Sequence, residues 1–337
     1  TGNVAVGDTA LDSIESGASN NVAIGSGAGT AITTGDLMTA VGFRALFTED
    51  TGERSTAVGA YALTAQNSAV ENYNTAVGYA AGTAVTTGIQ NTLIGALSGD
   101  AITTGSNNTS VGMNSLSANT TASYNSAFGK SALLSNTTGA NNSAVGFGAL
   151  ANNTTGTANS AMGGTTLTTN TTGSYNSGFG RDSLGLNTTG SNNVAVGESA
   201  LYANTTASNN TAVGKSALVA NTTGANNVAL GATSLQLNTT GANNTALGKG
   251  ALVFNTTASN NTGVGYLALN ANTTGAQNSA IGIYALASNT TGADNVAMGY
   301  NSLGANTTGG NNTSVGFRAL QENTTGTENT IVGAFAG

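Results

Sequence analysis

The chain has no cysteine, proline, histidine or tryptophan, and charged residues make up only 6% of its 337 residues. Without cysteine there is no disulfide framework and no thiolate metal site, and without histidine the commonest general base is missing. No apolar run approaches the roughly 18–20 residues that a membrane-spanning helix needs. We therefore expect a protein that is not an enzyme, binds no metal or cofactor and does not insert into a membrane.

The few charges are unevenly distributed. Residues 1–100 carry nine acidic and two basic side chains, whereas residues 101–337 carry five of each. A surface that binds phosphate backbones needs clustered lysine and arginine, so we expect no nucleic-acid partner. An ion could bind at the acidic residues of the first coil, although a solvated acidic surface is the simpler explanation of Asp8, Asp12 and Glu15. A second acidic cluster is interpreted as a charged loop: Glu49, Asp50 and Glu53.

What the sequence does have is a repeat, with the consensus N-T-A-V-G-x-x-A-L-x-x-N-T-T-G-x-N. The glycine that closes N-T-A-V-G recurs every 17 residues from Gly78 to Gly333, after earlier spacings of 18, 17, 17 and 19 from Gly7. We distinguish less regular, acidic coils over residues 1–77 from one continuous repeat domain over 78–337. So strict a spacing predicts that each coil meets its neighbour in the same way, as in a stacked solenoid. The chain begins with Thr1 and shows no signal peptide, which indicates a processed or truncated product.

The composition of the repeat favours β-structure, because glycine, asparagine and threonine are weak helix formers. We predict an all-β fold, a parallel β-solenoid of about twenty 17-residue coils, with two short strands per coil. One strand covers N-T-A-V and the other lies around the A-L segment. Repeat positions four and nine, which are apolar, are predicted to form the core: Val77, Ile94, Val111, Phe128, Val145, Leu116, Leu133 and Leu150.

Three atypical coils support a shared interior. In each of them the leucine of position nine is a glycine, and the asparagine of position twelve is an apolar residue. The pairs are Gly29 with Ile32, Gly82 with Val85, and Gly99 with Ile102. Compensation of this kind is expected if both positions fill one close-packed space. A second repeat subtype without any packing link is the alternative explanation.

A single chain offers one valine-like and one leucine-like side chain per coil, and full burial of each contributes only about 1.5–3 kcal/mol. Self-association would bury a further face. Position three is the predicted self-association column, because alternate residues of a strand point to opposite sides and small residues allow close approach. The column contains Ala127, Ala144, Ala161, Ala195 and Ala212. Alanine as the filler of a narrow coil is an equally good explanation.

Segments 193–200 (NVAVGESA) and 278–285 (NSAIGIYA) resemble the head repeat of YadA-type trimeric autotransporter adhesins, N-S-x-A-I-G-x-x-A. The longer form with Asn-Thr-Thr-Gly resembles repeats of phage tail fibres and of marine bacterial surface proteins. The resemblance covers the whole chain. It implies a left-handed parallel β-roll, a homotrimer, and a role in adhesion or host recognition. The coil of the adhesin head is shorter, so the additional residues must widen the coil or bulge from it.

Asn-Thr-Thr occurs thirteen times from Asn119 to Asn323, and each copy is a formal N-glycosylation sequon. We favour turn geometry and side-chain ladders as the reason for these residues. The second threonine forms a ladder that resembles the ice-binding faces of some antifreeze solenoids, although the familiar Thr-x-Thr array is absent. The ladder contains Thr121, Thr138, Thr155, Thr172 and Thr189.

These observations lead to one expected function and one alternative. We expect a structural, extracellular rod on a virion or cell surface, a segment of a phage tail fibre, bacterial adhesin or extracellular filament. Its partners would be copies of itself, as a homotrimer or polymer, and a host-cell receptor or glycan. Exposed aromatic side chains such as Tyr202, Phe254, Tyr266 and Tyr284 suit such contacts but occupy different repeat positions. The alternative is an ice-binding β-solenoid that uses its threonine and asparagine ladders.

Overall fold

The structure is a computed structural model that describes residues 2–337, and the chain divides into two compact units, Thr1–Thr172 and Gly173–Gly337. Each unit is a parallel β-solenoid with one strand of three residues per coil. No helix occurs across residues 2–337. The all-β solenoid predicted from the repeat is therefore confirmed. The difference in regularity between residues 1–77 and 78–337 stays a distinction made from the sequence.

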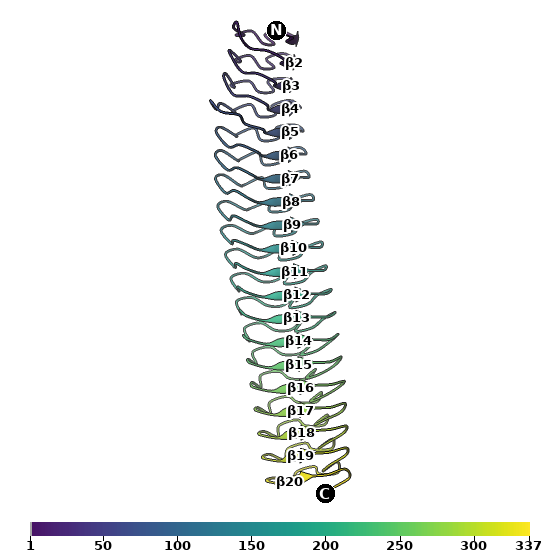
Figure 1. The fold of residues 1–337 in the computed structure, drawn as a ribbon. Coiled ribbons are helices and arrows are strands. Elements are labelled where there is room, and N and C mark those ends of the chain that lie inside the picture. Colours follow the sequence, from purple (N-terminus) through teal and green to yellow (C-terminus); the bar gives the residue numbers. More distant parts are fainter. Residues whose placement is uncertain (1) are drawn as a thin grey trace. The chain divides into compact units, whose positions relative to one another are not determined.

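Figure 1 shows the strands of each unit following one another in chain order. Unit 1 (Thr1–Thr172) contains β1 (Val4–Val6), β2 (Val22–Ile24), β3 (Thr39–Val41), β4 (Thr56–Val58), β5 (Thr75–Val77), β6 (Thr92–Ile94), β7 (Thr109–Val111), β8 (Ser126–Phe128), β9 (Ser143–Val145) and β10 (Ser160–Met162). Unit 2 (Gly173–Gly337) contains β11 (Ser177–Phe179), β12 (Val194–Val196), β13 (Thr211–Val213), β14 (Val228–Leu230), β15 (Thr245–Leu247), β16 (Thr262–Val264), β17 (Ser279–Ile281), β18 (Val296–Met298), β19 (Thr313–Val315) and β20 (Thr330–Val332).

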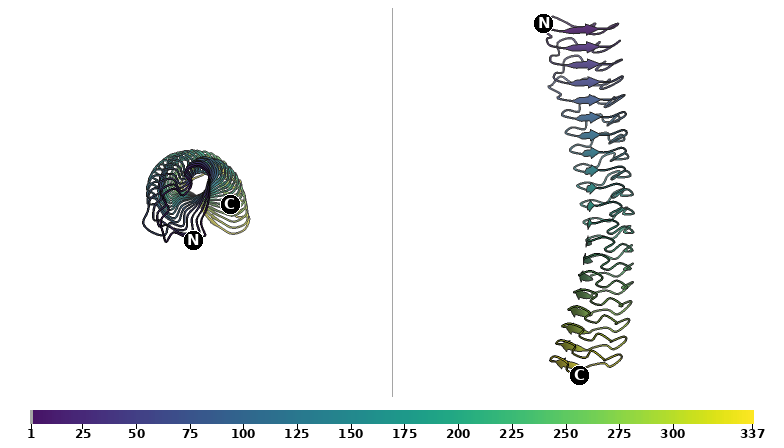
Figure 2. Two further views of the ribbon diagram at one scale, coloured as in Figure 1. Left: turned by 90° about the horizontal axis from the view of Figure 1, so that it is seen from above. Right: turned by 90° about the vertical axis from the view of Figure 1, so that its right-hand side faces the viewer.

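Within each unit every strand pairs in parallel with the strand of the next coil, and equivalent repeat positions lie opposite each other. Ala127 of β8, for example, is the partner of Ala144 of β9. In unit 2, Ala195 of β12 is the partner of Ala212 of β13. The strands therefore form a ladder along one side of the coils (Figure 2), and each repeat position becomes a column of similar side chains.

The predicted second strand around the A-L segment is wrong, because this segment forms turns. In the coil of β8, Ser131 and Leu133 adopt left-handed backbone conformations, with φ of 59° and 52°. The Ala132 amide donates to the Gly129 carbonyl at 3.2 Å, and the Asn136 amide donates to the Leu133 carbonyl at 3.2 Å. The left-handed backbone of the leucines is unfavourable, and burial of the leucine side chains inside the coil offsets this cost.

The interior of the coil is formed by positions three and nine. The alanines of position three, Ala127, Ala144, Ala161, Ala195 and Ala212, are at most 2% exposed within a single chain. They are therefore not a surface for association, and that prediction is wrong. The leucines predicted for the core, Leu116, Leu133 and Leu150, are completely buried, as expected. Because each leucine reaches across the coil toward the strand, only a small side chain fits on the inner side of the strand.

Position four was predicted for the core and instead faces outward. Val77, Ile94, Phe128 and Val145 are 37–41% exposed, and Val111 is half-buried. Alternation along a strand puts positions two and four on the side opposite position three. Where position nine is leucine, that side chain already fills the space opposite the strand. The larger residue of the strand is therefore excluded from the interior by volume.

The proposed compensation between positions nine and twelve is supported by the packing. Ile32, Val85 and Ile102 are buried, and a Cβ built on Gly99 would lie 2.8 Å from Ile102 Cδ1. Leu93 takes part as well, because it replaces alanine at position three in β6. The same Cβ on Gly99 would lie 2.8 Å from Leu93 Cδ2. These coils exchange the leucine of position nine for other apolar side chains in the same space.

Two buried asparagine columns complete the interior, at positions one and twelve. Asn125 donates from Nδ2 to the Gly139 carbonyl at 3.0 Å, and its Oδ1 accepts from the Asn142 amide at 3.0 Å. Asn136 donates from Nδ2 to the same carbonyl at 2.9 Å and to Asn119 Oδ1 at 3.0 Å. These two asparagines therefore bind both their own coil and a neighbouring coil, which satisfies polar groups that no water reaches. Asn261 departs from the pattern, because its buried Nδ2 has no partner.

Candidate interaction surfaces

Both units share an apolar surface, the outer strand face, which we define as the side chains of positions two and four. Position two is threonine, serine or valine, and position four is a larger apolar residue in every coil. Exposed position-four side chains in unit 1 are Val6, Ile24, Val77, Ile94, Phe128, Val145 and Met162. Those in unit 2 are Phe179, Val196, Leu230, Ile281, Met298 and Val332.

The outer strand face carries no charged side chain, because positions two and four are uncharged throughout the repeat. Soluble monomers rarely expose apolar patches larger than a few hundred Å², and larger patches mark interaction sites.

Sequence reasoning missed this surface because it assigned the valine-like column to the interior. The alternation within N-T-A-V was visible in the sequence, but which side faces inward depends on how much space the coil encloses.

The predicted threonine ladder is exposed at every one of its positions, Thr121, Thr138, Thr155, Thr172 and Thr189. The threonine that precedes each of them is half-buried and is used differently. Thr137, for example, donates its hydroxyl to the Thr154 carbonyl of the next coil at 3.0 Å. Only the second of the two threonine columns is therefore exposed to a ligand or to ice.

Twelve of the thirteen asparagines of the Asn-Thr-Thr sequons, from Asn119 to Asn306, are inaccessible in the folded protein, and the last, Asn323, is half-buried. Asn136, Asn153 and Asn204, for example, are fully buried. The Nδ2 atom of Asn153, to which a glycan would be attached, donates to Asn136 Oδ1 at 2.8 Å and to the Gly156 carbonyl at 2.9 Å. The ladder function of these asparagines is therefore incompatible with a glycan on the same nitrogen.

A charged network lies on the turns that follow three successive strands of unit 2, β11, β12 and β13. Arg181 Nη2 and Lys215 Nζ bind the two carboxylate oxygens of Glu198, at 2.6 and 3.1 Å. The hydrogen bond from Arg181 lowers the pKa of Glu198, and Lys215 acts in the same direction. The hydrogen bond to Glu198 raises the pKa of Arg181. All three groups are solvent-exposed, so we expect little contribution to stability.

The acidic residues Glu49, Asp50 and Glu53, which the sequence suggested as a charged loop, do not share one environment. Glu49 is fully buried. It occupies position twelve in place of asparagine. Glu49 Oε2 accepts from Gln66 Nε2 at 2.7 Å and from Asn72 Nδ2 at 3.1 Å, and Oε1 accepts from the Gly52 amide at 2.9 Å. Glu49 is thus a structural member of the buried ladder.

Within the part of the chain that the structure describes, no group of three acidic, cysteine or histidine side chains is placed to hold a metal ion. That includes Asp8, Asp12 and Glu15. A helix of the length and apolarity needed to cross a membrane is not found after Thr1 either. No protein-family model matches the chain, and no curated protein matches its sequence.

Proposed function

We propose that the chain is a structural segment of an extracellular fibre or adhesin, on a virion or cell surface, and that its copies associate through the outer strand face. The observation that carries this proposal is the uncharged, apolar position-four column, exposed in both units. A surface of this kind is costly to leave in water and is suited to packing against an identical surface.

A homotrimer is the proposed form of association, in a left-handed coil. The support is the resemblance of the repeat to the heads of trimeric autotransporter adhesins. The register of the strands also supports it, because equivalent positions lie opposite each other in successive coils of each unit. Three such columns can meet with position-four side chains at a shared axis. The exposed threonine ladder, Thr121 to Thr189, would then face outward.

The test is the solution mass at low micromolar concentration. We expect the full chain to have a mass near three times 32.6 kDa. The variant Phe128→Glu/Val145→Glu puts charges on the outer strand face and is expected to give a monomer, because unpaired charge is strongly disfavoured in an apolar interface. The control Thr121→Glu/Thr138→Glu puts the same charges on the threonine ladder and should leave the mass unchanged. A full chain that stays monomeric would contradict the proposal.

Ice binding is a second candidate function, because the threonine ladder is exposed and repeats once per coil. Thermal hysteresis is the measurement. If the ladder binds ice, the wild-type chain depresses freezing and the variant Thr138→Lys/Thr155→Lys does not. The outer strand face variant, Phe128→Glu/Val145→Glu, serves as the control and should retain the activity. A wild-type chain without hysteresis or ice shaping removes this candidate.

A further inference from the structure

Aromatic side chains from five consecutive coils of unit 2 lie against one another in a row, which we name the aromatic ladder. The ring centroids of successive members are 5.6, 6.2, 5.3 and 5.2 Å apart. The members follow strands β16 to β20, one per coil: Tyr266, Tyr284, Tyr300, Phe317 and Phe335. The sequence hid this row because three of its members occupy repeat position six and two, Tyr284 and Phe335, occupy position seven. The left-handed backbone at Tyr284 and Phe335 occurs where the ring comes from position seven.

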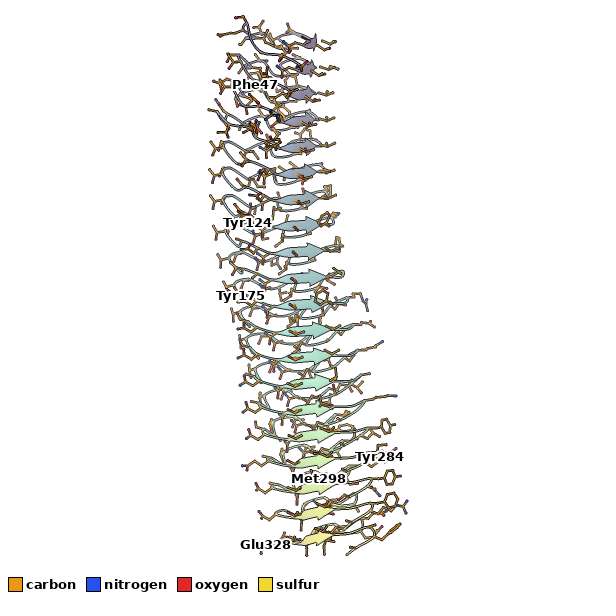
Figure 3. The ribbon with its side chains drawn as sticks, in the orientation of Figure 1. Phe47, Tyr124, Tyr175, Tyr284, Met298 and Glu328 are labelled. Carbon is orange, nitrogen blue, oxygen red and sulfur yellow. The ribbon has the colours of Figure 1, made fainter. Side chains whose placement is uncertain are left out.

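The aromatic ladder is open to solvent. Tyr266, Tyr300, Phe317 and Phe335 are 39–69% exposed although each ring also contacts its neighbours. Figure 3 shows Tyr284 beyond the carboxyl ends of the strands, where it projects away from the ribbon. The hydroxyl groups of the three tyrosines have no hydrogen-bond partner within residues 2–337. Ordered rings with free hydroxyl groups form a surface that is preorganised for a ligand with both apolar and polar groups.

An unpaired cation lies on the ladder. The Arg318 guanidinium is 5.4 Å from the centroid of Phe317 and 5.9 Å from that of Tyr300. Arg181 and Lys215 bind carboxylates, but Arg318 has no carboxylate partner in the described part of the chain. Positions six and seven of these five coils hold no acidic residue. The ring contacts fix the guanidinium in place while its donors stay available to an anion.

The same arrangement occurs in unit 1, which makes an accidental cluster a poor explanation. The sequence Val-Gly-Phe-Arg-Ala-Leu occupies residues 41–46 and again residues 315–320. Arg44 lies 5.4 Å from the centroid of Phe43, which begins a shorter row with Tyr61 and Tyr79 at 5.3 and 6.0 Å. Arg44 likewise has no carboxylate partner among the described residues.

We propose that the aromatic ladder of unit 2 binds a linear acidic polysaccharide, with pyranose rings packed against the exposed parts of the aromatic rings and a carboxylate bound to Arg318. The ladder offers one ring per coil; the coils repeat at the spacing of parallel strands, about 4.8 Å, and lateral offsets between the rings lengthen the centroid separations to 5.2–6.2 Å. An extended chain of pyranose units advances by nearly the same length per sugar. The C–H groups of a pyranose can pack against exposed aromatic carbons, and its hydroxyl groups can bond to the tyrosine hydroxyls.

Other occupants fit the ladder less well. A second copy of the chain would be contacted through features that recur in every coil, as the outer strand face does. The ladder instead occupies five coils, and the same turn in earlier coils of unit 2 carries Arg181, Glu198, Lys215 and Lys249. Nucleic acid needs several cations for its phosphates, and the ladder has one. The inference rests on the proposed function, since it gives a surface fibre its ligand.

The first measurement is the binding of the full chain to polygalacturonate and to its fully methylated ester, by titration calorimetry. The two polymers share a backbone and differ in charge. We expect polygalacturonate to bind roughly tenfold more tightly than the ester, and less tightly as salt rises, since a charge-assisted bond to Arg318 is lost in the ester. Failure of both polymers to bind would overturn the proposal.

Variants then separate the contribution of the aromatic rings to binding from that of the Arg318 charge. Tyr300→Ala/Phe317→Ala is expected to lower the affinity for both polymers to the level that the shorter row of unit 1 retains, and Arg318→Gln to lower affinity for polygalacturonate toward that for the ester. The control is Phe254→Ala, an exposed aromatic of unit 2 outside the ladder. Equal losses in the control would contradict a specific site.

The solution mass of each variant is measured in parallel. A ladder variant that dissociates the oligomer would overturn the proposal in favour of an interface, whereas a monomeric wild type that still binds polygalacturonate would contradict only the proposed assembly.

Discussion

Replacing Gly129 with alanine is expected to destabilise unit 1 by more than about 3 kcal/mol, because two separate penalties act at this position. Gly129 has φ of 132°, a conformation that is open to glycine and closed to other residues. A Cβ at this position would also lie 2.6 Å from the Gly146 carbonyl oxygen and 2.8 Å from its carbon. Both atoms are backbone, so relief requires a change in the spacing of two paired coils.

The same column recurs at the end of every strand, and a Cβ on Gly214 of unit 2 would likewise lie 2.6 Å from the Gly231 carbonyl carbon. We expect Gly214→Ala to have a comparable effect. The measurement is the midpoint of urea unfolding followed by circular dichroism, compared among variants of the same chain. If a Cβ at these glycines pointed into solvent, we would instead expect alanine to leave the urea midpoint almost unchanged.

Gly164→Ala is the matched control for Gly129→Ala. A Cβ on Gly164 meets no atom within 4 Å, and its backbone is not in a left-handed conformation. Alanine at such a site restricts the unfolded chain and should leave stability unchanged or raise it by about 0.4–1 kcal/mol. If both variants unfold at the same urea concentration, close approach of the coils at the glycine column does not determine their stability.

The periodicity of the sequence was sufficient to predict the class of fold. A constant spacing of 17 residues from Gly78 to Gly333 can be satisfied only by equivalent coils, and glycine and asparagine at fixed positions exclude long helices. The burial of the leucine column was also predictable. Where glycine replaces leucine at position nine, as at Gly99, an apolar residue replaces asparagine at position twelve, as at Ile102, which indicates that both positions fill the same space.

The orientation of the strand could not be predicted in the same way. Alternation shows that Phe128 and Ala127 point to opposite sides, but not which of them faces inward. Hydrophobicity favours the larger residue inside, and available volume reversed that choice here. The left-handed backbone at Leu133 is likewise a property of the closed coil, since leucine alone would not predict it.

The aromatic ladder was missed for a related reason. Tyr266 and Tyr284 occupy different repeat positions, so no single column of the repeat contains the row. The positive φ at position seven, which occurs at Tyr284, is part of a turn that the sequence suggested would be a strand. Candidate binding residues on turns therefore depend on backbone details that a repeat alignment does not contain.

Replacing Asn136 with alanine is the second substitution with a large expected effect, a destabilisation of about 2–4 kcal/mol. Asn136 donates to Asn119 Oδ1 and to the Gly139 carbonyl, and it accepts from Asn153 Nδ2 at 2.8 Å. Alanine removes all three hydrogen bonds and leaves buried partners that water cannot reach. Urea unfolding of the full chain measures the change.

Asn152→Ala is the control, because Asn152 lies next to the ladder asparagine Asn153 and is exposed. It should alter stability by less than about 0.5 kcal/mol. Equal effects of Asn136→Ala and Asn152→Ala would show that the buried amide is not what holds neighbouring coils together.

Asn136→Asp tests the direction of the hydrogen bonds in the same ladder. An ionised carboxylate accepts hydrogen bonds and cannot donate to Asn119 Oδ1 or the Gly139 carbonyl, so we expect a loss at least as large as that of alanine. Glu49 shows the condition under which an acid is tolerated at this position, because its carboxylate is surrounded by donors from Gln66, Asn72 and Gly52. A stable Asn136→Asp variant at neutral pH would mean that the ladder rearranges around an acceptor, and the cost of a buried, unsatisfied carbonyl would no longer explain why asparagine fills this column.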